Sequence, residues 1–307
     1  MSNEAIARIL MLVTTAAFGG TWVAAPWATD EIQPLTVAFI RFSIAAALLY
    51  LFCRARGVAV RATRADLPLI LGVALTSVAG YNVLFLYGVT LAPASHGAVI
   101  VPGLIPGATM LLARAALGER IVRRRAVGVL IAIAGLVLVV GPELEGSPAT
   151  ALGDAMFAIS AGLWAIYTLV SRAAASRFHA AAITFLGAAA GAAILLPLAL
   201  LAPGGFGDPL AASGRAIGGV LYLATFGTAI SFVTFSEGVR RLGAPRASAY
   251  SVLIPLFGVT LTVVLLGEPL TPTALLGVPV VLAGLWLTQS PSPPESAAGR
   301  LPQKETA

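Results

Sequence analysis

Long apolar stretches separated by short polar connections run from residue 6 to residue 289. A helix that crosses a bilayer needs about 20 mostly apolar residues, and ten segments reach or approach that length. They are Ile6–Ala25, Pro34–Cys53, Leu67–Gly88, Ser95–Ala115, Ala126–Gly141, Gly153–Arg172, Ala180–Leu201, Ile217–Val239, Pro245–Gly267 and Thr273–Gln289. The pattern therefore predicts an all-α membrane protein with ten transmembrane helices.

The composition supports a membrane protein, because only 10% of the 307 residues are charged and 58% are hydrophobic. A soluble domain has about 25% charged residues, so this chain cannot cover a water-facing surface with polar groups. The apolar content also excludes disorder for most of the chain. The exception is the tail, residues 290–307, which is rich in Pro and Ser and is predicted to be a disordered cytoplasmic segment.

The basic residues alternate along the chain in a way that predicts its orientation. One set of connections carries Arg54, Arg56, Arg61, Arg64, Arg120, Arg123, Arg124, Arg125, Arg172, Arg177, Arg240, Arg241 and Arg246. The opposite set carries Arg215 with Asp30, Glu31, Glu143, Glu145 and Asp208. Because cytoplasmic loops carry the excess of Lys and Arg, both termini are predicted to be cytoplasmic, in a bacterial inner membrane. The net charge of +6 follows from these loops, and no basic helix or stacking platform indicates nucleic-acid binding.

The second half of the sequence repeats the first. Pro106 and Pro255 are 149 residues apart, and the same offset relates Gly118-Glu119 to Gly267-Glu268. The other pairs are Gly128 and Gly277, Gly135 and Gly284, Gly88 and Gly238, and Trp22 and Trp164. Each half, residues 1–141 and 153–289, has five predicted spans, so the second half enters the membrane upside down. Inverted repeats are a common plan of secondary transporters, with the substrate near the midplane, although a duplication without mechanistic consequence gives the same pattern.

These features resemble the drug/metabolite transporter superfamily, in its members with two EamA-type domains. The resemblance rests on Ala38–Phe42, on the two Gly-Glu pairs and on the glycines that follow them, and it covers residues 6–289. It implies a ten-helix fold with a central cavity lined by spans 1, 3, 4, 6, 8 and 9, with spans 5 and 10 at the periphery. It also implies export of amino acids, metabolites or toxic compounds, with import in some members.

Arg41 is the sharpest single candidate, because it lies seven residues into a predicted span, about 10 Å along the helix from Pro34. A charge at that depth is costly, so Arg41 is expected to face the bundle interior or water. It either attracts an anionic group such as a substrate carboxylate, or it has a structural role bonded to helix-end carbonyls or at the outer interface. The resemblance implies an Arg here across members with different substrates, which favours structure or gating.

Aromatic and polar residues on the expected cavity-lining spans complete the predicted substrate site. With Arg41, the candidates are Trp22, Tyr81, Asn82, His96, Trp164, Tyr167 and Tyr250. Buried aromatic rings with a few polar tips suit a small amphipathic ligand. Ordinary packing or an interfacial aromatic belt is the alternative explanation for any one of them.

Two further groups of residues have candidate roles in coupling and gating. Glu237, near the cytoplasmic end of span 8, forms an ion pair with the arginines below it or takes up a proton that drives transport. Pro102, Pro106 and Pro255 interrupt helical hydrogen bonding in spans 4 and 9 and are candidate hinges. Glu119 and Glu268 recur at helix ends and are interpreted as structural caps of the helix that follows each.

No enzymatic motif is found in the sequence: it has no P-loop, H-E-x-x-H or G-x-S-x-G pattern, and its one cysteine, Cys53, belongs to no metal-ligand spacing. We therefore expect no catalytic residue, metal or cofactor. The sequence predicts a secondary transporter that exports amino acids or similar small metabolites by alternating access. A multidrug or toxic-compound exporter, and a non-transporting membrane scaffold or sensor, are the alternatives. The sequence leaves open which substrate is transported and in which direction. It also leaves open whether transport is coupled to protons or another gradient or is uniport, and whether the protein is a monomer or a homodimer.

Overall fold

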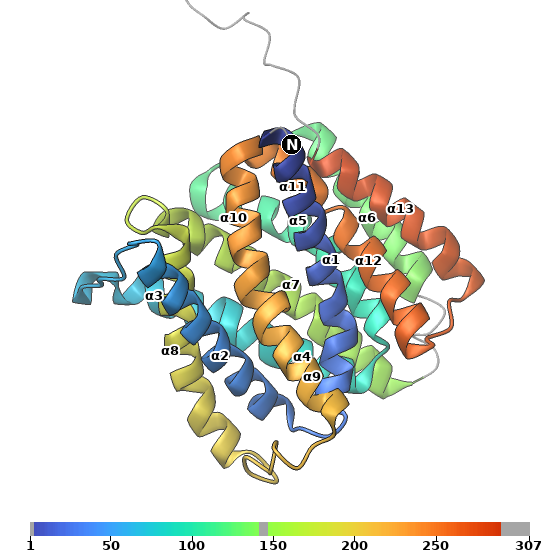
Figure 1. Ribbon diagram of the computed structural model, residues 1–307. Helices are drawn as coiled ribbons and strands as arrows, with labels where there is room; N and C mark the ends of the chain where they lie inside the picture. Colours follow the sequence, from blue (N-terminus) through green and yellow to red (C-terminus); the bar gives the residue numbers. More distant parts are fainter. Residues whose placement is uncertain (1–2, 141–146, 290–307) are drawn as a thin grey trace, which may run out of the picture.

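The computed structural model describes residues 3–140 and 147–289, and its regular structure there is entirely helical (Figure 1). The first half contains α1 (Asn3–Thr29), α2 (Pro34–Ala55), η1 (Arg64–Asp66), α3 (Leu67–Val73), η2 (Ala74–Gly80), α4 (Tyr81–Leu91), α5 (Ala94–Leu117) and α6 (Arg123–Val140). The second half contains α7 (Pro148–Ala174), α8 (Ala180–Leu201), α9 (Gly214–Ala224), η4 (Thr225–Ile230), α10 (Ser231–Leu242), α11 (Ala244–Tyr250), α12 (Leu253–Leu261), η5 (Thr262–Leu266) and α13 (Pro272–Gln289). The predicted disordered tail, 290–307, lies outside the described residues.

Eight helical segments of the described chain are long and apolar enough to cross a membrane. They correspond to eight of the ten predicted spans, and the largest shift of a boundary is at the start of α7, which begins at Pro148 and not at Gly153. The fifth predicted span is the 18-residue helix α6, which begins with three arginines. The ninth contains a shorter apolar helical segment, Leu253–Leu266. The all-α membrane architecture is confirmed, whereas the count of ten spans stays a prediction.

The predicted ninth span is divided into α11, α12 and η5. Ser251 and Val252 separate α11 from α12, and Pro255 follows in the first turn of α12. A proline ring clashes with the carbonyl four residues upstream, so the interruption falls where Pro255 requires it. By contrast, Pro102 and Pro106 lie inside the continuous helix α5. A break in the helix accompanies Pro255 alone of the three, and the gating role of all three stays a prediction.

The repeated Gly-Glu pair ends a helix in the same way in both halves. Gly118 and Gly267 have φ of +67° and +71°, a left-handed conformation that glycine adopts without steric cost. The N–H of the glutamate that follows bonds back into the helix, from Glu119 to Ala113 at 3.4 Å and from Glu268 to Thr262 at 3.5 Å. The motif is therefore a helix stop that leaves the glutamate side chain at the end of the bundle.

The inverted repeat is visible in how the helices pack. Helix α1 packs against α9, α10 and α12 of the second half, and its counterpart α7 packs against α3, α4 and α5 of the first half. Helix α2 packs against α8, and α6 packs against α13, at opposite edges of the bundle (Figure 1). Contacts that are exchanged between the halves in this way are expected of two inverted units around a central interface.

The contact between α6 and α13 depends on the four glycines that follow the Gly-Glu pairs. These are Gly128, Gly135, Gly277 and Gly284. A Cβ on Gly135 would lie 2.6 Å from the backbone nitrogen of Val281, and one on Gly284 would lie 2.4 Å from that of Ala132. Small residues let two membrane helices approach backbone to backbone. The glycine spacing that the halves share is therefore the interface between their last helices.

Replacing Gly135 by Ala is expected to destabilise the protein by about 1–3 kcal/mol, because the new methyl group meets backbone atoms of α13. The matched control is Gly218→Ala in α9, where a Cβ would meet nothing within 4 Å. That change should be neutral or stabilising by up to about 1 kcal/mol. Thermal unfolding of the purified variants in detergent compares them, and equal stability of the two would contradict this packing.

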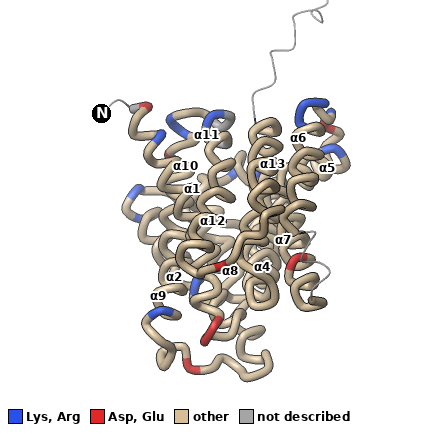
Figure 2. Tube along the Cα trace, turned by 90° about the vertical axis from the view of Figure 1, so that its right-hand side faces the viewer, with Lys and Arg blue, Asp and Glu red and all other residues tan. Residues whose placement is uncertain are grey.

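Charge divides the two ends of the bundle (Figure 2). Most basic residues gather at the end that carries Arg54–Arg64, Arg120–Arg125, Arg172–Arg177 and Arg240–Arg246, which we call the basic end. The opposite, acidic end carries Asp30, Glu31 and Asp208. This is the distribution that the sequence predicts for a protein whose basic end faces the cytoplasm.

Candidate functional site

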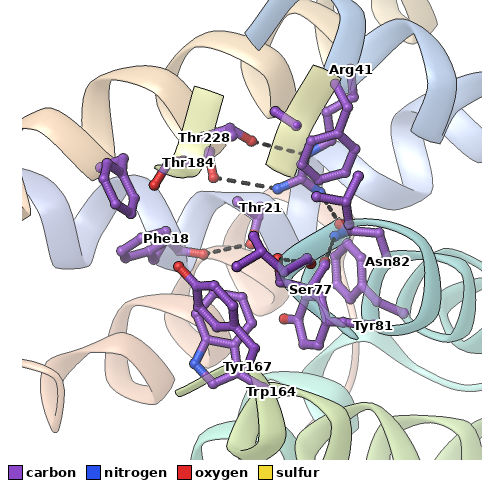
Figure 3. A pocket seen from close by; sticks show the side chains of 17 residues that line it. Phe18, Thr21, Arg41, Ser77, Tyr81, Asn82, Trp164, Tyr167, Thr184 and Thr228 are labelled. Carbon is purple, nitrogen blue, oxygen red and sulfur yellow. Dashed lines mark hydrogen bonds between the residues drawn. The ribbon is translucent and has the colours of Figure 1, made fainter. Parts of the chain in front are cut away.

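A cavity lies between helices of both halves, and most of its lining residues are well inside the long apolar helical segments, away from their ends. Figure 3 shows it from close by. It holds about 730 Å³ of space free of protein atoms, including the part that opens to solvent. Its polar lining comprises Thr21, Arg41, Ser77, Asn82, Thr184 and Thr228, and its aromatic lining comprises Phe18, Phe42, Tyr81, Phe85, Trp164, Tyr167 and Phe232. These residues come from predicted spans 1, 2, 3, 6, 7 and 8. The resemblance implied spans 4 and 9 in place of 2 and 7, and no described residue of α5 or α12 lines this cavity.

Arg41 joins the two halves at the wall of this cavity. Its Nε donates to Thr228 Oγ1 at 3.1 Å, Nη1 donates to Asn82 Oδ1 at 2.8 Å, and Nη2 donates to the Gly227 carbonyl at 3.3 Å. The residue is 6% exposed, and among the described residues no carboxylate forms an ion pair with it. A guanidinium has five N–H groups, so two remain for a ligand. Arg41 is thus a fixed, buried cation without a protein anion.

Two π-helical segments position the residues that hold Arg41. The segments η2 and η4 begin 151 residues apart, at Ala74 and Thr225, in equivalent spans of the two halves. The wider turn leaves carbonyl groups for side chains: Asn82 Nδ2 donates to the Ser77 carbonyl at 2.5 Å, and Thr228 Oγ1 donates to the Leu223 carbonyl at 2.9 Å. Single π-turns inside α-helices frequently mark functional sites. Here they orient one partner of Arg41 from each half.

Aromatic rings form the wall of the cavity away from Arg41 (Figure 3). The ring centroid of Trp164 lies 4.9 Å from that of Tyr81 and 5.0 Å from that of Tyr167. Tyr81 also stacks on Phe85 at 5.9 Å. Rings of this kind offer a large apolar contact area with hydroxyl and indole N–H groups at their edges. A fixed cation facing an aromatic wall suits a small amphipathic anion.

The cavity brings together five of the eight predicted substrate-binding residues, namely Arg41, Tyr81, Asn82, Trp164 and Tyr167. Trp22 is instead 3% exposed in the core, where its ring meets Phe85 and Phe157 edge-on at 4.9 and 5.7 Å. The equivalent tryptophans of the two halves therefore have different surroundings, Trp22 in packed core and Trp164 in a cavity wall.

His96 lies towards the acidic end, beside a second and smaller cavity that Glu268 also lines. Its Nδ1 is 3.1 and 3.2 Å from the two carboxylate oxygens of Asp154, and the side chains are 4% and 7% exposed. The pair joins α5 of the first half to α7 of the second. Asp154 is not among the residues predicted from the sequence, because it is the second residue of the predicted span Gly153–Arg172 and resembles a polar helix end. Helix α7 begins earlier, at Pro148, which puts the carboxylate inside the helix.

Glu268 caps a helix of the other half. Its carboxylate accepts hydrogen bonds from the backbone N–H groups of Ala94 and Ser95, each at 2.8 Å, at the start of α5. A carboxylate there satisfies N–H groups without an intrahelical partner and complements the helix dipole. The expectation that Glu119 and Glu268 cap the helices following them was wrong: Glu268 reaches α5, and Glu119 pairs with Arg172.

Removal of the Glu268 carboxylate is expected to loosen the acidic end. Loss of a helix cap costs about 1 kcal/mol, which corresponds to roughly a fivefold shift between closed and open conformers. In a Cys53→Ala background, a Ser160→Cys probe at a buried position of α7 should then react several times faster with a thiol reagent when Glu268 is replaced by Ala. Glu119→Ala at the basic end is the matched control and should leave the rate unchanged. Equal rates in the two variants would contradict this role of Glu268.

Tyr250 and Glu237 lie outside both cavities. Tyr250 ends α11, which packs against α1 and α13. The Glu237 carboxylate accepts from Arg240 Nε at 2.7 Å and from Arg241 Nε at 2.6 Å, with its side chain 29% exposed. This geometry fits the first of the two roles considered for Glu237, an ion pair with the arginines that follow it. Proton uptake at Glu237 stays a prediction.

The two halves are also joined at the acidic end by Glu31 and Ser213. The Glu31 carboxylate accepts from the Ser213 N–H at 2.7 Å and from the Ser213 hydroxyl at 2.5 Å. Hydrogen bonds to the ionised form favour it, so Ser213 holds the pKa of Glu31 below its usual value. With the buried His96–Asp154 pair, the Glu268 cap and the Thr36 hydroxyl, which donates to the Phe206 carbonyl at 3.0 Å, the described residues of this end form four polar links between the halves.

The ion pairs between the halves at the basic end are more exposed. Arg172 pairs with Glu119, and Arg177 pairs with Asp66 at 2.7 Å. The arginine side chains are 58% and 47% exposed and that of Glu119 is 44% exposed, whereas the Asp66 side chain is 7% exposed. Exposed ion pairs contribute about 0–1 kcal/mol, whereas breaking a buried pair is far more costly. In this conformation the acidic end is therefore the more firmly closed of the two.

Comparison with known proteins agrees with this architecture. Residues 5–141 and 151–289 each match the model of the EamA-like transporter family. A probable terminal-alkyne amino-acid exporter from Streptantibioticus cattleyicolor is 29% identical over 260 residues, covering 84% of this chain and 82% of that protein. A probable amino-acid metabolite efflux pump from Salmonella typhimurium is 24% identical over 286 residues, covering 91% and 93%.

The fold also matches a solved crystal structure that is 22% identical, with a TM-score of 0.66 over 92% of this chain and 95% of that one. At this identity the likeness concerns the fold alone. The family matches cover nearly the whole chain, in two segments that follow the two halves. This chain therefore belongs to the EamA-like transporter family, as the sequence resemblance predicted, and is a multi-pass membrane protein that transports small molecules.

Proposed function

We propose that this protein is a secondary transporter that exports amino acids, or small metabolites derived from them, by alternating access. The observation that carries the proposal is Arg41, a buried cation in the central cavity with two N–H groups left for a ligand. Carboxylates are the natural partners of guanidinium groups, because paired N–H groups match the two oxygens. The printed names of the Streptantibioticus and Salmonella relatives support the same substrate class.

Alternating access is supported by the unequal surroundings of Trp22 and Trp164. The two residues are equivalent in the repeat, yet Trp22 is packed in the core and Trp164 lines the cavity. If the halves exchange conformations, Trp164 becomes packed and Trp22 becomes exposed to a cavity nearer the acidic end. Such an exchange moves a central site from one side of the membrane to the other.

The direction of this conformation follows from the positive-inside rule. We propose that the basic end and both termini are cytoplasmic, so that the firmly closed acidic end is external. The protein would then be described in a state that takes up substrate from the cytoplasm. A solute or proton gradient supplies the energy, with Glu237 as the candidate proton site, or the protein is a facilitated uniporter.

A multidrug exporter is the second candidate, and the aromatic wall of Trp164, Tyr81 and Tyr167 favours it. Aromatic surfaces accept many apolar solutes, whereas a fixed guanidinium selects for an anionic group. The two candidates therefore differ in whether neutral or cationic solutes are transported.

Transport into proteoliposomes tests the proposal, with a mixed pool of labelled amino acids and their deaminated counterparts at matched and opposed pH gradients. Uptake of some members, lost in Trp164→Ala, is the expected result. A pH dependence that is lost in Glu237→Gln would add proton coupling. If folded protein transports only neutral or cationic drugs, the second candidate is favoured, and no flux of any amino acid or deaminated acid would overturn the proposed substrate class.

A further inference from the structure

We infer that the central cavity selects carboxylates with a single negative charge and an apolar body over zwitterionic amino acids. This inference rests on the proposed function, and it specifies the net charge of the substrate that binds in the same cavity. Arg41 supplies one buried positive charge. A ligand with one negative charge leaves the occupied cavity neutral, whereas a zwitterion leaves it with an excess positive charge in a medium of low dielectric constant.

No acidic side chain of the described residues is positioned to receive an ammonium group in the cavity. The acidic residues in or next to the described spans lie elsewhere: Glu4 pairs with Arg8, Glu31 accepts from Ser213, Asp66 is bonded to Thr63 and Arg177, Glu119 to Arg172, Asp154 to His96, Glu237 to Arg240 and Arg241, and Glu268 to the start of α5, while Asp30 follows the end of α1. None of them lines the cavity. The substrate ammonium therefore has no carboxylate partner there.

Backbone carbonyls are the other usual acceptors for an ammonium inside a membrane, where helices are interrupted. Here the carbonyls that the π-helical segments release already accept from side chains. Ser77 accepts from Asn82, Gly227 accepts from Arg41, and Leu223 accepts from Thr228. These bonds build the Arg41 site, and they use one of the two lone pairs of each of these carbonyl oxygens.

The remaining polar atoms of the wall are neutral. The hydroxyl groups of Thr21, Ser77 and Thr184 donate to carbonyls in their own helices, which leaves only their oxygen lone pairs for a ligand. Neutral acceptors replace part of the hydration of an ammonium but do not compensate its charge. The aromatic wall offers an apolar surface to the rest of the molecule. The ligand that fits these features together is an amphipathic monocarboxylate.

Such solutes are the products of amino-acid deamination or of N-acylation, reactions that remove the positive charge of the amine and leave the carboxylate. The class of reaction that supplies the substrate is therefore one that consumes the free amino group. Export of such products is consistent with a transporter whose resting site opens towards the cytoplasm.

Competition for transport in proteoliposomes tests this inference with solutes that share one apolar body. The set is 3-phenylpropanoate and N-acetylphenylalanine as anions, phenylalanine as the zwitterion and phenylalaninamide as the cation, with 4-methylpentanoate and leucine as an aliphatic pair. The measured quantity is uptake of a labelled solute that the protein transports. Each anion is expected to inhibit this uptake at a concentration at least about tenfold lower than the corresponding zwitterion does, and the amide should not inhibit it. Equal or stronger inhibition by phenylalanine and leucine would overturn the inference and leave amino-acid export standing.

A variant with a negative charge in the cavity tests whether the preference for anions depends on charge or on the shape of the cavity. Thr184→Asp places a carboxylate in the cavity lining, and Thr184→Asn is the matched uncharged variant. The aspartate should lower the preference for anions over zwitterions at least several-fold, and the asparagine should keep it. An unchanged preference in Thr184→Asp would contradict the inference. Inhibition by the amide alone, or by no member of either series, would instead overturn the proposed function together with it.

Discussion

Transport of carboxylates by the Arg41→Gln variant should fall at least about 100-fold. Glutamine keeps a polar group near Thr228 and Asn82, but it removes the buried cation. Charge-assisted hydrogen bonds contribute about 1.5–3 kcal/mol each, and a loss of about 2.8 kcal/mol corresponds to 100-fold. Initial rates of uptake into proteoliposomes measure the effect.

Two variants serve as controls for Arg41. Arg41→Lys keeps the charge without the planar fork and should retain an intermediate rate. Arg215→Gln removes an arginine that lies over the Trp27 ring at the acidic end, outside the cavity, and should transport normally. Wild-type transport by folded Arg41→Gln would show that the guanidinium has only a structural role, which is the alternative that the sequence left open.

The His96→Leu variant is expected to lose about 3–5 kcal/mol of stability, the largest effect on folding that we expect for a single substitution. It leaves the Asp154 carboxylate, 7% exposed, without the imidazole that it contacts. Removing one member of a buried ion pair is costly because the other charge stays buried. The double variant with both residues changed to Leu should recover most of the loss, since replacing a buried pair by apolar residues is often nearly neutral.

Thermal unfolding in detergent compares the wild-type protein, the single variant and the double variant. A double variant that is less stable than His96→Leu alone would show that Asp154 is stabilised without His96. Asp154→Leu alone should cost less than His96→Leu, because a neutral imidazole can remain in the core without a counter-ion. This order of stabilities distinguishes a buried pair from two independent polar residues.

Much of the fold could be predicted from the sequence, because the bilayer fixes the length of apolar helices and the charge of loops. The repeat was also readable, since glycines such as Gly118 and Gly267 are required by a left-handed helix end in both halves. The sequence predicted an interruption at Pro102, Pro106 and Pro255 alike, and not that a break would accompany Pro255 alone. The apolar composition of the ninth span is continuous through Pro255, and the effect of a proline depends on whether its neighbours replace the lost hydrogen bonds. Pro102 and Pro106 show the opposite outcome.

The candidate site could be predicted only in part. Arg41 and Asn82 were found because polar groups in an apolar span are costly and so are informative. Asp154 was missed, because its depth depends on where α7 begins. The different surroundings of Trp22 and Trp164 could not be predicted at all, since a repeated sequence specifies two equivalent arrangements. The sequence does not specify which end of the bundle is closed, because this differs between conformations.

Protection of the cavity by a transported solute shows whether the substrate binds beside Arg41. Ser77→Cys, in a Cys53→Ala background, places the only thiol in the cavity lining, and its rate of reaction with a small maleimide is measured with and without 3-phenylpropanoate or phenylalanine. Whichever of these solutes the protein transports should slow the reaction at least several-fold, and Arg41→Gln should abolish this protection. A reaction rate that a transported solute leaves unchanged would show that the substrate passes by another route.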